Sequence, residues 1–211
     1  MEFLDYILHI DRYLEIMLND YQNWFYVILF LLIFIETGLV IMPFLPGDSL
    51  LFASGMLAAS FPSQLNISLV LFCLLLAAIL GDSVNYSIGK YLGNKLIKIQ
   101  FFGRRIIKDS AIQKTENFFY KYGSKTIVIA RFVPIVRTLA PFVAGISKMH
   151  YKTFIKYNIL GGTIWVIGIT FIGYFLGRIS FIKNNFEVAV LVIILFSLLP
   201  ILIEYIKNRK K

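Results

Sequence analysis

Residues 130–145, ARFVPIVRTLAPFVAG, place two arginines and two prolines inside a stretch that is otherwise apolar enough for a lipid bilayer. An arginine at mid-membrane costs roughly 2.5–3.5 kcal/mol even on a lenient scale, so Arg131 and Arg137 are expected to face partners or a water-filled cavity. Pro134 and Pro141 each remove a backbone donor, which favours a broken helix or a re-entrant hairpin over a plain spanning helix. Irregular backbone at membrane depth is tolerated only inside protein or beside a cavity. The stretch therefore predicts a binding site.

The composition indicates an integral membrane protein. Hydrophobic residues make up 58% of the 211 residues, and the mean hydropathy is +0.76. At ~20 residues for each spanning helix, there is room for one bundle of about four spans plus re-entrant segments. The acidic first residues lack a basic region and a cleavage site, so we expect no secretory signal peptide. The lone Cys73 is expected to be a small core residue.

The charge distribution indicates how the chain is oriented in the membrane. Residues 1–89 contain eight acids and one base, whereas residues 90–211 contain twenty bases and four acids. Because the bases flank hydrophobic segments, the positive-inside rule explains them better than nucleic-acid binding, which we do not expect. The basic segments at 90–125 and 148–156 should therefore be cytoplasmic, and both termini of this multi-pass protein should lie on the same side.

The hydropathy pattern predicts an all-α membrane protein with about four transmembrane helices and two re-entrant hairpins. It divides the chain into an N-terminal amphipathic interfacial helix at 1–22, a core at 23–180, and a C-terminal transmembrane helix with a basic tail at 186–211. The predicted segments, in chain order, are a span at 24–41, a hairpin at about 43–62, a span at 65–91, a basic loop at 90–125, a hairpin at about 126–147, and spans at 157–177 and 188–206. Part of the basic loop is expected to form a surface helix near anionic lipid.

The first hairpin is predicted from the breakers Pro43, Pro46 and Gly47, which interrupt an apolar stretch close to its start and precede the charged Asp48. The second is predicted from Pro134 and Pro141. Basic segments on both sides of the second hairpin indicate that it leaves and re-enters the membrane on one side.

Three short motifs recur in the same order in the two halves of the chain. FLP at 44–46 matches FVP at 132–134, FASG at 52–55 matches FVAG at 142–145, and IGKYLG at 88–93 matches IGYFLG at 172–177. The offsets are 88, 90 and 84 residues. With the expected topology, the copies would be inverted, an architecture found in secondary transporters with a site near the membrane midplane. The repeated glycines are expected to let helices approach closely.

Four charges lie within this predicted core: Glu36, Asp48, Arg131 and Arg137. Unpaired in hydrocarbon, they would cost roughly 10–14 kcal/mol, so they must be paired, hydrated or bound to a ligand. One interpretation is two structural salt bridges. The other is a site in which the arginines, whose planar forks fit phosphate oxygens, bind a phosphate, while the acids carry protons.

The chain resembles the DedA family, the bacterial branch of membrane proteins with the SNARE-associated Golgi-type domain. The resemblance rests on Glu36 with PFLPGD at 43–48, on GDSVNYSIGKYLG at 81–93, and on RFVPIVRTLAPFVAG at 131–145. Ala130 and Lys90 depart from the residues common in the family at these positions. Together these motifs and the spans cover most of residues 25–180.

The resemblance implies two inverted re-entrant hairpins and a flippase of the bacterial inner membrane that moves a phosphorylated lipid between leaflets. The implied substrate is undecaprenyl phosphate, with proton coupling and without a cofactor or metal, and a homodimer is one possible assembly. The resemblance implies phosphate-binding roles for Arg131 and Arg137, and proton-coupling or pairing roles for Glu36 and Asp48. It makes Asp82 and Tyr86 a secondary pair.

Three other interpretations remain open. A membrane lipid phosphatase would need a nucleophile and a general acid near the arginines, yet His9 and His150 are the only histidines and lie in interfacial segments. A proton-coupled cation or drug transporter would depend on the acids rather than the arginines. A purely structural role would tolerate exchange of the charges within each acid–arginine pair.

Overall fold

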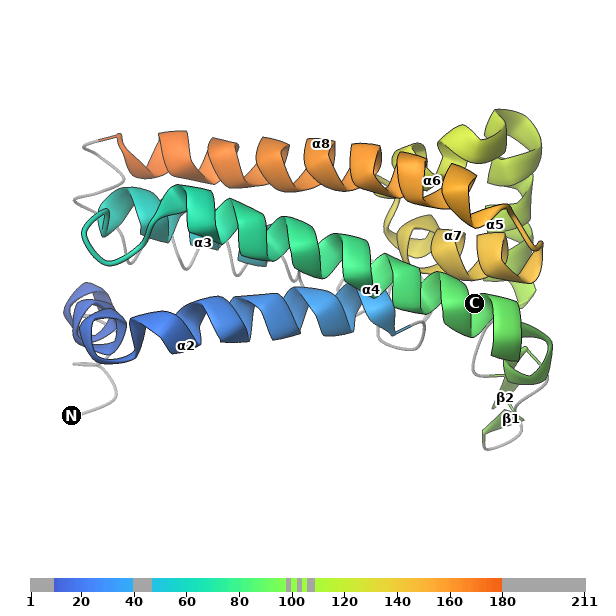
Figure 1. Ribbon diagram of the computed structural model, residues 1–211, viewed down its shortest axis with the longest axis horizontal. Coiled ribbons are helices and arrows are strands. Elements are labelled where there is room, and N and C mark those ends of the chain that lie inside the picture. The colour runs from blue at the N-terminus through green and yellow to red at the C-terminus, as the bar shows by residue number, and fades with distance from the viewer. Residues whose placement is uncertain (1–9, 40–46, 98–99, 102–103, 106–108, 180–211) are drawn as a thin grey trace, which may run out of the picture. The chain divides into compact units, whose positions relative to one another are not determined.

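The computed structural model describes residues 10–39, 47–97, 100–101, 104–105 and 109–179, and these are almost entirely helical. The elements are α2 (Ile10–Gly38), α3 (Gly47–Ser60), α4 (Ile67–Leu96), β1 (Gln100–Phe101), β2 (Arg104–Arg105), α5 (Asp109–Tyr122), a 3-10 turn (Gly123–Lys125), α6 (Thr126–Ala130), α7 (Pro134–Ile146) and α8 (Tyr151–Gly177) (Figure 1). The predicted span at 188–206 and the breakers Pro43 and Pro46 lie outside the described residues.

Two of the described helices are long and apolar enough to cross a membrane. These are α4, with 30 residues, and α8, with 27 residues. Residues 23–38 of α2 form a shorter apolar helix, where the sequence predicts a span at 24–41. A non-helical backbone at Tyr21 (φ −129°, ψ 29°) kinks α2, close to the predicted boundary between the interfacial helix and the core.

The structure bears out the helical fold class and corrects one detail of the sequence-based expectations. Within the basic segment at 90–125, where the sequence predicts a surface helix, α4 continues to Leu96 and α5 occupies much of the remainder. Between these helices β1 and β2 form a minimal antiparallel pair, with Gln100 opposite Arg105. Pro141 does not break the chain, because it lies inside the continuous helix α7.

The chain divides into two compact units. One comprises Met1–Phe30, Pro46–Leu74 and Val166–Lys211, and the other comprises Leu31–Leu45 and Leu75–Trp165. We call them unit 1 and unit 2. In unit 1, the side chain of Asn66 caps α4 by accepting from the backbone N–H of Ser68 at 2.9 Å. The backbone N–H of Asn66 donates to the hydroxyl of Tyr26 at 2.9 Å, which ties the start of α4 to α2.

Glycines make corresponding helix contacts within the two units. In unit 1, a Cβ on Gly173 of α8 would lie 2.1 Å from the carbonyl oxygen of Phe52 on α3. In unit 2, a Cβ on Gly89 of α4 would lie 2.1 Å from the carbonyl oxygen of Phe142 on α7. Both contacts join the motifs that recur in the sequence, so each unit packs a short helix on a long helix through glycine.

We expect Gly89→Ala to destabilise the protein by about 1–3 kcal/mol, because the methyl group meets backbone that cannot yield without moving a helix. Gly168→Ala is the matched control, since nothing lies within 4 Å of its added Cβ and alanine is the better helix former. Thermal unfolding in detergent should show a lower Tm for Gly89→Ala alone. Equal Tm values for the two variants would contradict the close approach.

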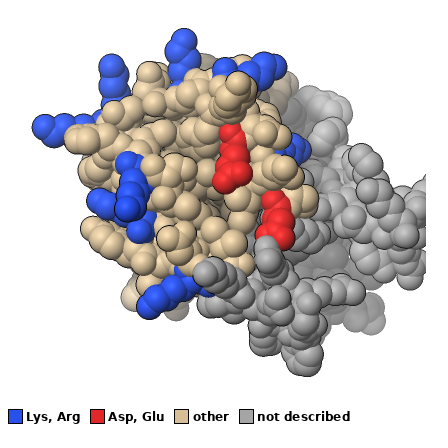
Figure 2. Space-filling view, turned by 90° about the vertical axis from the view of Figure 1, so that its right-hand side faces the viewer, with Lys and Arg blue, Asp and Glu red and all other residues tan. Residues whose placement is uncertain are grey.

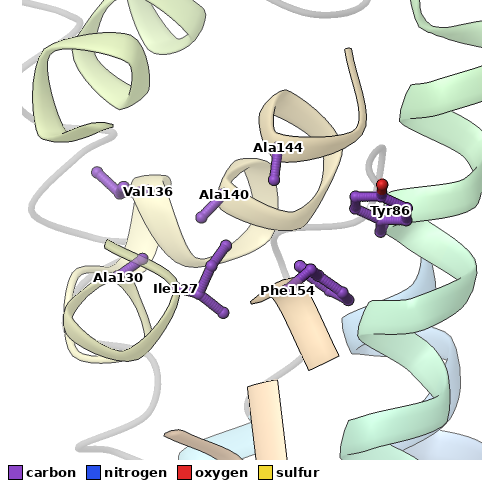
Figure 3. Packing of buried hydrophobic residues seen from close by; sticks show 7 residues of the cluster. All are labelled: Tyr86, Ile127, Ala130, Val136, Ala140, Ala144 and Phe154. Carbon is purple, nitrogen blue, oxygen red and sulfur yellow. The ribbon is translucent and has the colours of Figure 1, made fainter. Parts of the chain in front are cut away.

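A buried apolar cluster holds α6 and α7 against the parts of α4 and α8 that belong to unit 2. Figure 3 shows its members, which are Tyr86, Ile127, Ala130, Val136, Ala140, Ala144 and Phe154. The rings of Tyr86 on α4 and Phe154 on α8 stack with centroids 4.5 Å apart. The small alanines let α6 and α7 lie close to these rings. The cluster thereby fixes the short segment between α6 and α7 that carries Arg131.

Candidate functional site

Arg131 lies where the helix breaks between α6 and α7. It is the C-terminal cap of α6, and α7 begins three residues later at Pro134. The residue before a proline is disfavoured in the α region, and Val133 is accordingly extended (φ −123°, ψ 104°). The break predicted from Pro134 is therefore observed, and it turns the chain at the arginine.

The guanidinium of Arg131 is held by one residue from each long helix. Its Nη2 donates to the carboxylate of Asp82 on α4 and to the side-chain oxygen of Asn158 on α8, the latter at 2.6 Å. The Asn158 amide also donates to the carbonyl of Ile79 at 3.1 Å, one turn before Asp82. The side chains of Arg131 and Asp82 are only 3% and 9% exposed. This buried network joins three elements and fixes the orientation of the arginine.

Two glycines of α8 make room for the side chain of Arg131. A Cβ on Gly161 would lie 3.2 Å from Cδ and 3.3 Å from Nε of Arg131. A Cβ on Gly162 would lie 3.5 Å from Nη2. Nε of Arg131 is itself buried, without a hydrogen-bond partner among the described residues. Arg131 thus retains a donor that the described part of unit 2 does not use.

Arg137 forms the second pair of the site, with Glu36. Arg137 is in the first turns of α7 and donates from Nη2 to Oε1 of Glu36, near the end of α2, at 2.7 Å. The side chains are 12% and 6% exposed. Both pairs lie within unit 2. The sequence predicts Glu36 and Asp48 as the pairing acids, whereas the pairs observed in unit 2 use Glu36 and Asp82. The Arg137 side chain is the more exposed of the two arginines.

Trp165 of α8 brings the two pairs into one site. The guanidinium carbon of Arg137 lies 4.2 Å from the centre of its ring, and that of Arg131 lies 5.5 Å away. The ring is almost completely buried. A cation over an aromatic face is stabilised by about 0.5–2 kcal/mol. Trp165 therefore provides an apolar surface that both arginines share.

We expect a measurable coupling between Trp165 and Arg137. In a double-mutant cycle with Trp165→Leu and Arg137→Met, the coupling free energy should be about 0.5–2 kcal/mol. The same cycle with Arg131→Met should give a smaller coupling, because that guanidinium lies farther from the ring. Unfolding in detergent measures both cycles. Additive effects in the Arg137 cycle would contradict the contact.

Asn85 holds together the two helices that carry the Glu36–Arg137 pair. Its buried side-chain amide donates to the carbonyl of Thr37 on α2 at 2.9 Å and to that of Thr138 on α7 at 3.0 Å. Each acceptor follows a member of the pair in the sequence. Asn85 therefore fixes the backbone beside Glu36 and beside Arg137, one turn of α4 beyond Asp82.

The structure brings together Glu36, Asp82, Arg131 and Arg137, but it gives the other predicted residues different surroundings. The Tyr86 hydroxyl donates to the carbonyl of Met149, and its ring belongs to the apolar cluster. Asp48 lies in the first turn of α3, which Gly47 opens, and both belong to unit 1. The acids that pair with the arginines within unit 2 come from α2 and α4.

Sequence reasoning did not identify Asn85, Asn158 or Trp165. A signal was available, because Asn158 and Trp165 are seven residues apart and lie on one face of a helix. Asn158 is also a polar residue within an apolar span, where polar groups need partners. Asn85 follows Asp82 by three residues on α4, which gives it the same face.

The site contains two cations, and each is balanced by its own acid. The two guanidinium groups offer forked donors, and the carboxylates neutralise them in a largely buried environment. A guanidinium has more N–H donors than its carboxylate partner occupies, so an anion at either arginine would compete with that carboxylate for the charge. Protonation of the carboxylate would weaken this competition.

Comparison with known proteins gives a consistent family assignment. The VTT domain model matches residues 45–175, which include Asp82, both arginines, Asn158 and Trp165. Protein DedA of Escherichia coli K12 is 47% identical over 207 residues, covering 98% of this chain and 94% of that protein. No solved structure matches the chain significantly.

More distant relatives extend the same assignment. An uncharacterized membrane protein of Mycobacterium tuberculosis is 44% identical over 174 residues, covering 82% of this chain and 75% of that protein. The inner membrane protein YqjA of E. coli K12 is 35% identical over 153 residues, covering 72% and 68%. The chain is therefore a membrane protein of the DedA family and carries its VTT domain.

Proposed function

We propose that this DedA-family protein is a flippase that moves undecaprenyl phosphate between the leaflets of the bacterial inner membrane and does not act as an enzyme on it. The observation that carries the proposal is the buried constellation of two arginines, each paired with its own acid and both beside Trp165. A forked, permanently charged donor suits phosphate oxygens. The lipid head would bind there while its prenyl chain stays in the bilayer.

The proposal gives the two arginines different roles. Arg131 is held by Asp82 and Asn158 and acts as the fixed member. The side chain of Arg137 is 12% exposed, against 3% for Arg131, and it exchanges Glu36 for the phosphate. Protonation of Glu36 would weaken its pair with Arg137 and favour this exchange, which links lipid binding to proton uptake. Asp48 is proposed as a further proton-carrying acid.

The proposed transport cycle also uses the predicted topology. The segment from α6 through the break at Arg131 to α7 would be the second re-entrant hairpin, and α3 would belong to the first. Support comes from the corresponding glycine contacts of the recurring motifs in units 1 and 2. Inverted repeats allow a central site to open alternately to either side of the membrane. Both termini would lie in the cytoplasm, on the side of the basic segments.

The test is a flip assay in proteoliposomes that contain labelled polyprenyl phosphate. The proposal predicts protein-dependent flipping that unlabelled polyprenyl phosphate inhibits more strongly than phosphatidylglycerol or polyprenol does. A pH gradient should change the rate. Lack of flipping by protein that remains folded would overturn the proposal.

The same assay separates the rival functions. Release of inorganic phosphate from the lipid would indicate a phosphatase. Uptake of an organic cation, dependent on Glu36 and Asp82 rather than on the arginines, would indicate a proton-coupled cation or drug transporter.

A further inference from the structure

Unit 2 contains a second concentration of positive charge, separate from the buried pairs. A cavity of about 520 Å³ lies where the end of α7, the start of α8 and the last turns of α4 meet. Lys90, Lys148 and His150 line it together with the tyrosines 86, 91 and 151. No carboxylate is among its lining residues. Figure 2 shows Lys and Arg side chains spread around this end of the molecule.

The basic side chains of this cavity have no acidic partner among the described residues. Neither Lys90 nor Lys148 forms an ion pair there, and the same holds for His150. All three residues are exposed. The ammonium group of Lys90 lies 5.5 Å from the centre of the Tyr91 ring. Tyrosine is typical of the boundary between lipid and water, where its ring is apolar and its hydroxyl is hydrated.

Lys148 occupies a position at which glycine is the usual residue. It follows α7 with a left-handed backbone (φ 53°). Its N–H bonds to the carbonyl of Gly145, and the N–H of Met149 bonds to that of Ala144, both at 3.0 Å. This is the Schellman motif, in which a residue with a Cβ is disfavoured at the left-handed position. A lysine there is a local cost to stability that places an ammonium group at the cavity.

An apolar groove adjoins the cationic cavity along α4. It has a volume of about 560 Å³ and is lined by Phe34 of α2 and by Leu80, Val84, Ile88 and Leu92 of α4. Spacings of four residues place these α4 side chains on one face. Tyr91 lines both the groove and the cationic cavity. The two spaces therefore meet at this residue.

We propose that these two spaces form one peripheral lipid site, with an anionic phosphate head in the cationic cavity and one hydrocarbon chain in the groove along α4. The proposal rests on the flippase function, because it names a loading position for the same class of lipid outside the buried arginines. The positive charge of the lysines in the cavity favours a lipid with an anionic head. Each lysine near a membrane surface attracts anionic lipid, and the groove supplies the apolar surface that a free phosphate would not need.

Native mass spectrometry of the detergent-purified full chain tests the number of lipids bound. The probes are a short-chain polyprenyl phosphate, the corresponding polyprenol, phosphatidylglycerol and inorganic phosphate. Wild type should bind two molecules of polyprenyl phosphate. The double variant Lys90→Gln/Lys148→Gln should bind the second molecule roughly tenfold or more weakly. Lys114→Gln, an exposed change on α5 outside the cavity, is the matched control and should retain both.

Two further variants separate the head site, the chain site and folding. Lys148→Gly should raise Tm, because glycine suits the left-handed position. It should nevertheless weaken the binding of the second lipid molecule. Val84→Trp should fill the groove. It should therefore weaken the binding of polyprenyl phosphate without changing the binding of inorganic phosphate.

The outcomes distinguish this site from the proposed function. Flipping by protein that binds one lipid for each chain, or equal binding by the lysine variants and wild type, would overturn the peripheral site alone. Polyprenol bound as tightly as polyprenyl phosphate would overturn it as well, as would an inorganic phosphate that displaces the lipid at equal concentration. Stronger retention of phosphatidylglycerol than of polyprenyl phosphate would also overturn the site as a loading position for the transported lipid.

Discussion

Arg137→Lys is expected to reduce flipping of polyprenyl phosphate roughly 10- to 100-fold, the equivalent of about 1.5–3 kcal/mol for hydrogen bonds to a charged group. Lysine keeps the positive charge but loses the planar fork that can hold two oxygens and lie over Trp165. The effect should appear in the proteoliposome flip assay with little change in Tm. A lysine that transports as well as arginine would show that charge alone suffices.

The matched control for this variant is Arg178→Lys. Arg178 is exposed and its guanidinium lies 5.8 Å from the ring of Tyr174, so the substitution likewise replaces a guanidinium beside an aromatic ring with an ammonium group. It belongs to unit 1 and is not part of the two buried pairs. We expect Arg178→Lys to flip lipid at the wild-type rate. A comparable loss of flipping in both variants would show that the effect is not specific to Arg137.

Asp82→Ala is expected to destabilise the protein by about 3–5 kcal/mol, because it leaves the guanidinium of Arg131 buried without its counter-ion. The measurement is unfolding in detergent, in which Asp82→Ala should lower Tm more than Gly89→Ala does. An exposed acid provides the control. Glu116→Ala on α5 removes the same kind of charge from an exposed position and should change Tm little.

Removing both charges of the pair should restore stability but not transport. In Asp82→Leu/Arg131→Met, apolar side chains of similar length replace the buried ions, which is often neutral or stabilising. Recovery of Tm together with loss of flipping would assign a functional role to the pair. If the double variant stays as unstable as Asp82→Ala, the pair is not the source of the instability.

The charged residues of the site could be predicted from the sequence because charge in an apolar segment has few explanations. Glu36, Arg131 and Arg137 were recognisable by their cost in hydrocarbon. Their partners were not predictable in the same way. Asp48 and Asp82 both follow glycine within apolar segments, and only the crossing of α4 with the break after α6 selects Asp82 for Arg131.

The limits of helices were predicted less well than their existence. The sequence predicts a span starting at 157, but α8 starts at Tyr151 and includes Lys152 and Lys156. Long basic side chains can extend from a helix end into the polar interface, so hydropathy alone places the start of the helix too late. Pro141 is a related case. The helix α7 accommodates it, and the break comes instead at Pro134, where the preceding residue is extended.

The recurring motifs predicted contacts that the sequence could not otherwise reveal. The glycines of IGKYLG and IGYFLG were expected to allow close packing, and Gly89 and Gly173 meet the backbones of Phe142 and Phe52 within their own units. The polar residues around the arginines could not be found this way, because Asn158 and Trp165 belong to no repeated motif. Their role depends on which helix face meets Arg131.

The most direct test of the proposed function is flipping by the charge-exchanged variant Glu36→Arg/Arg137→Glu. The exchange keeps the ion pair and should leave a Tm closer to wild type than either single variant has. It moves the guanidinium from α7, beside Trp165, to α2. We expect a folded protein that does not flip polyprenyl phosphate in proteoliposomes, whereas flipping at the wild-type rate would show that the pair only holds helices together and would contradict the proposal.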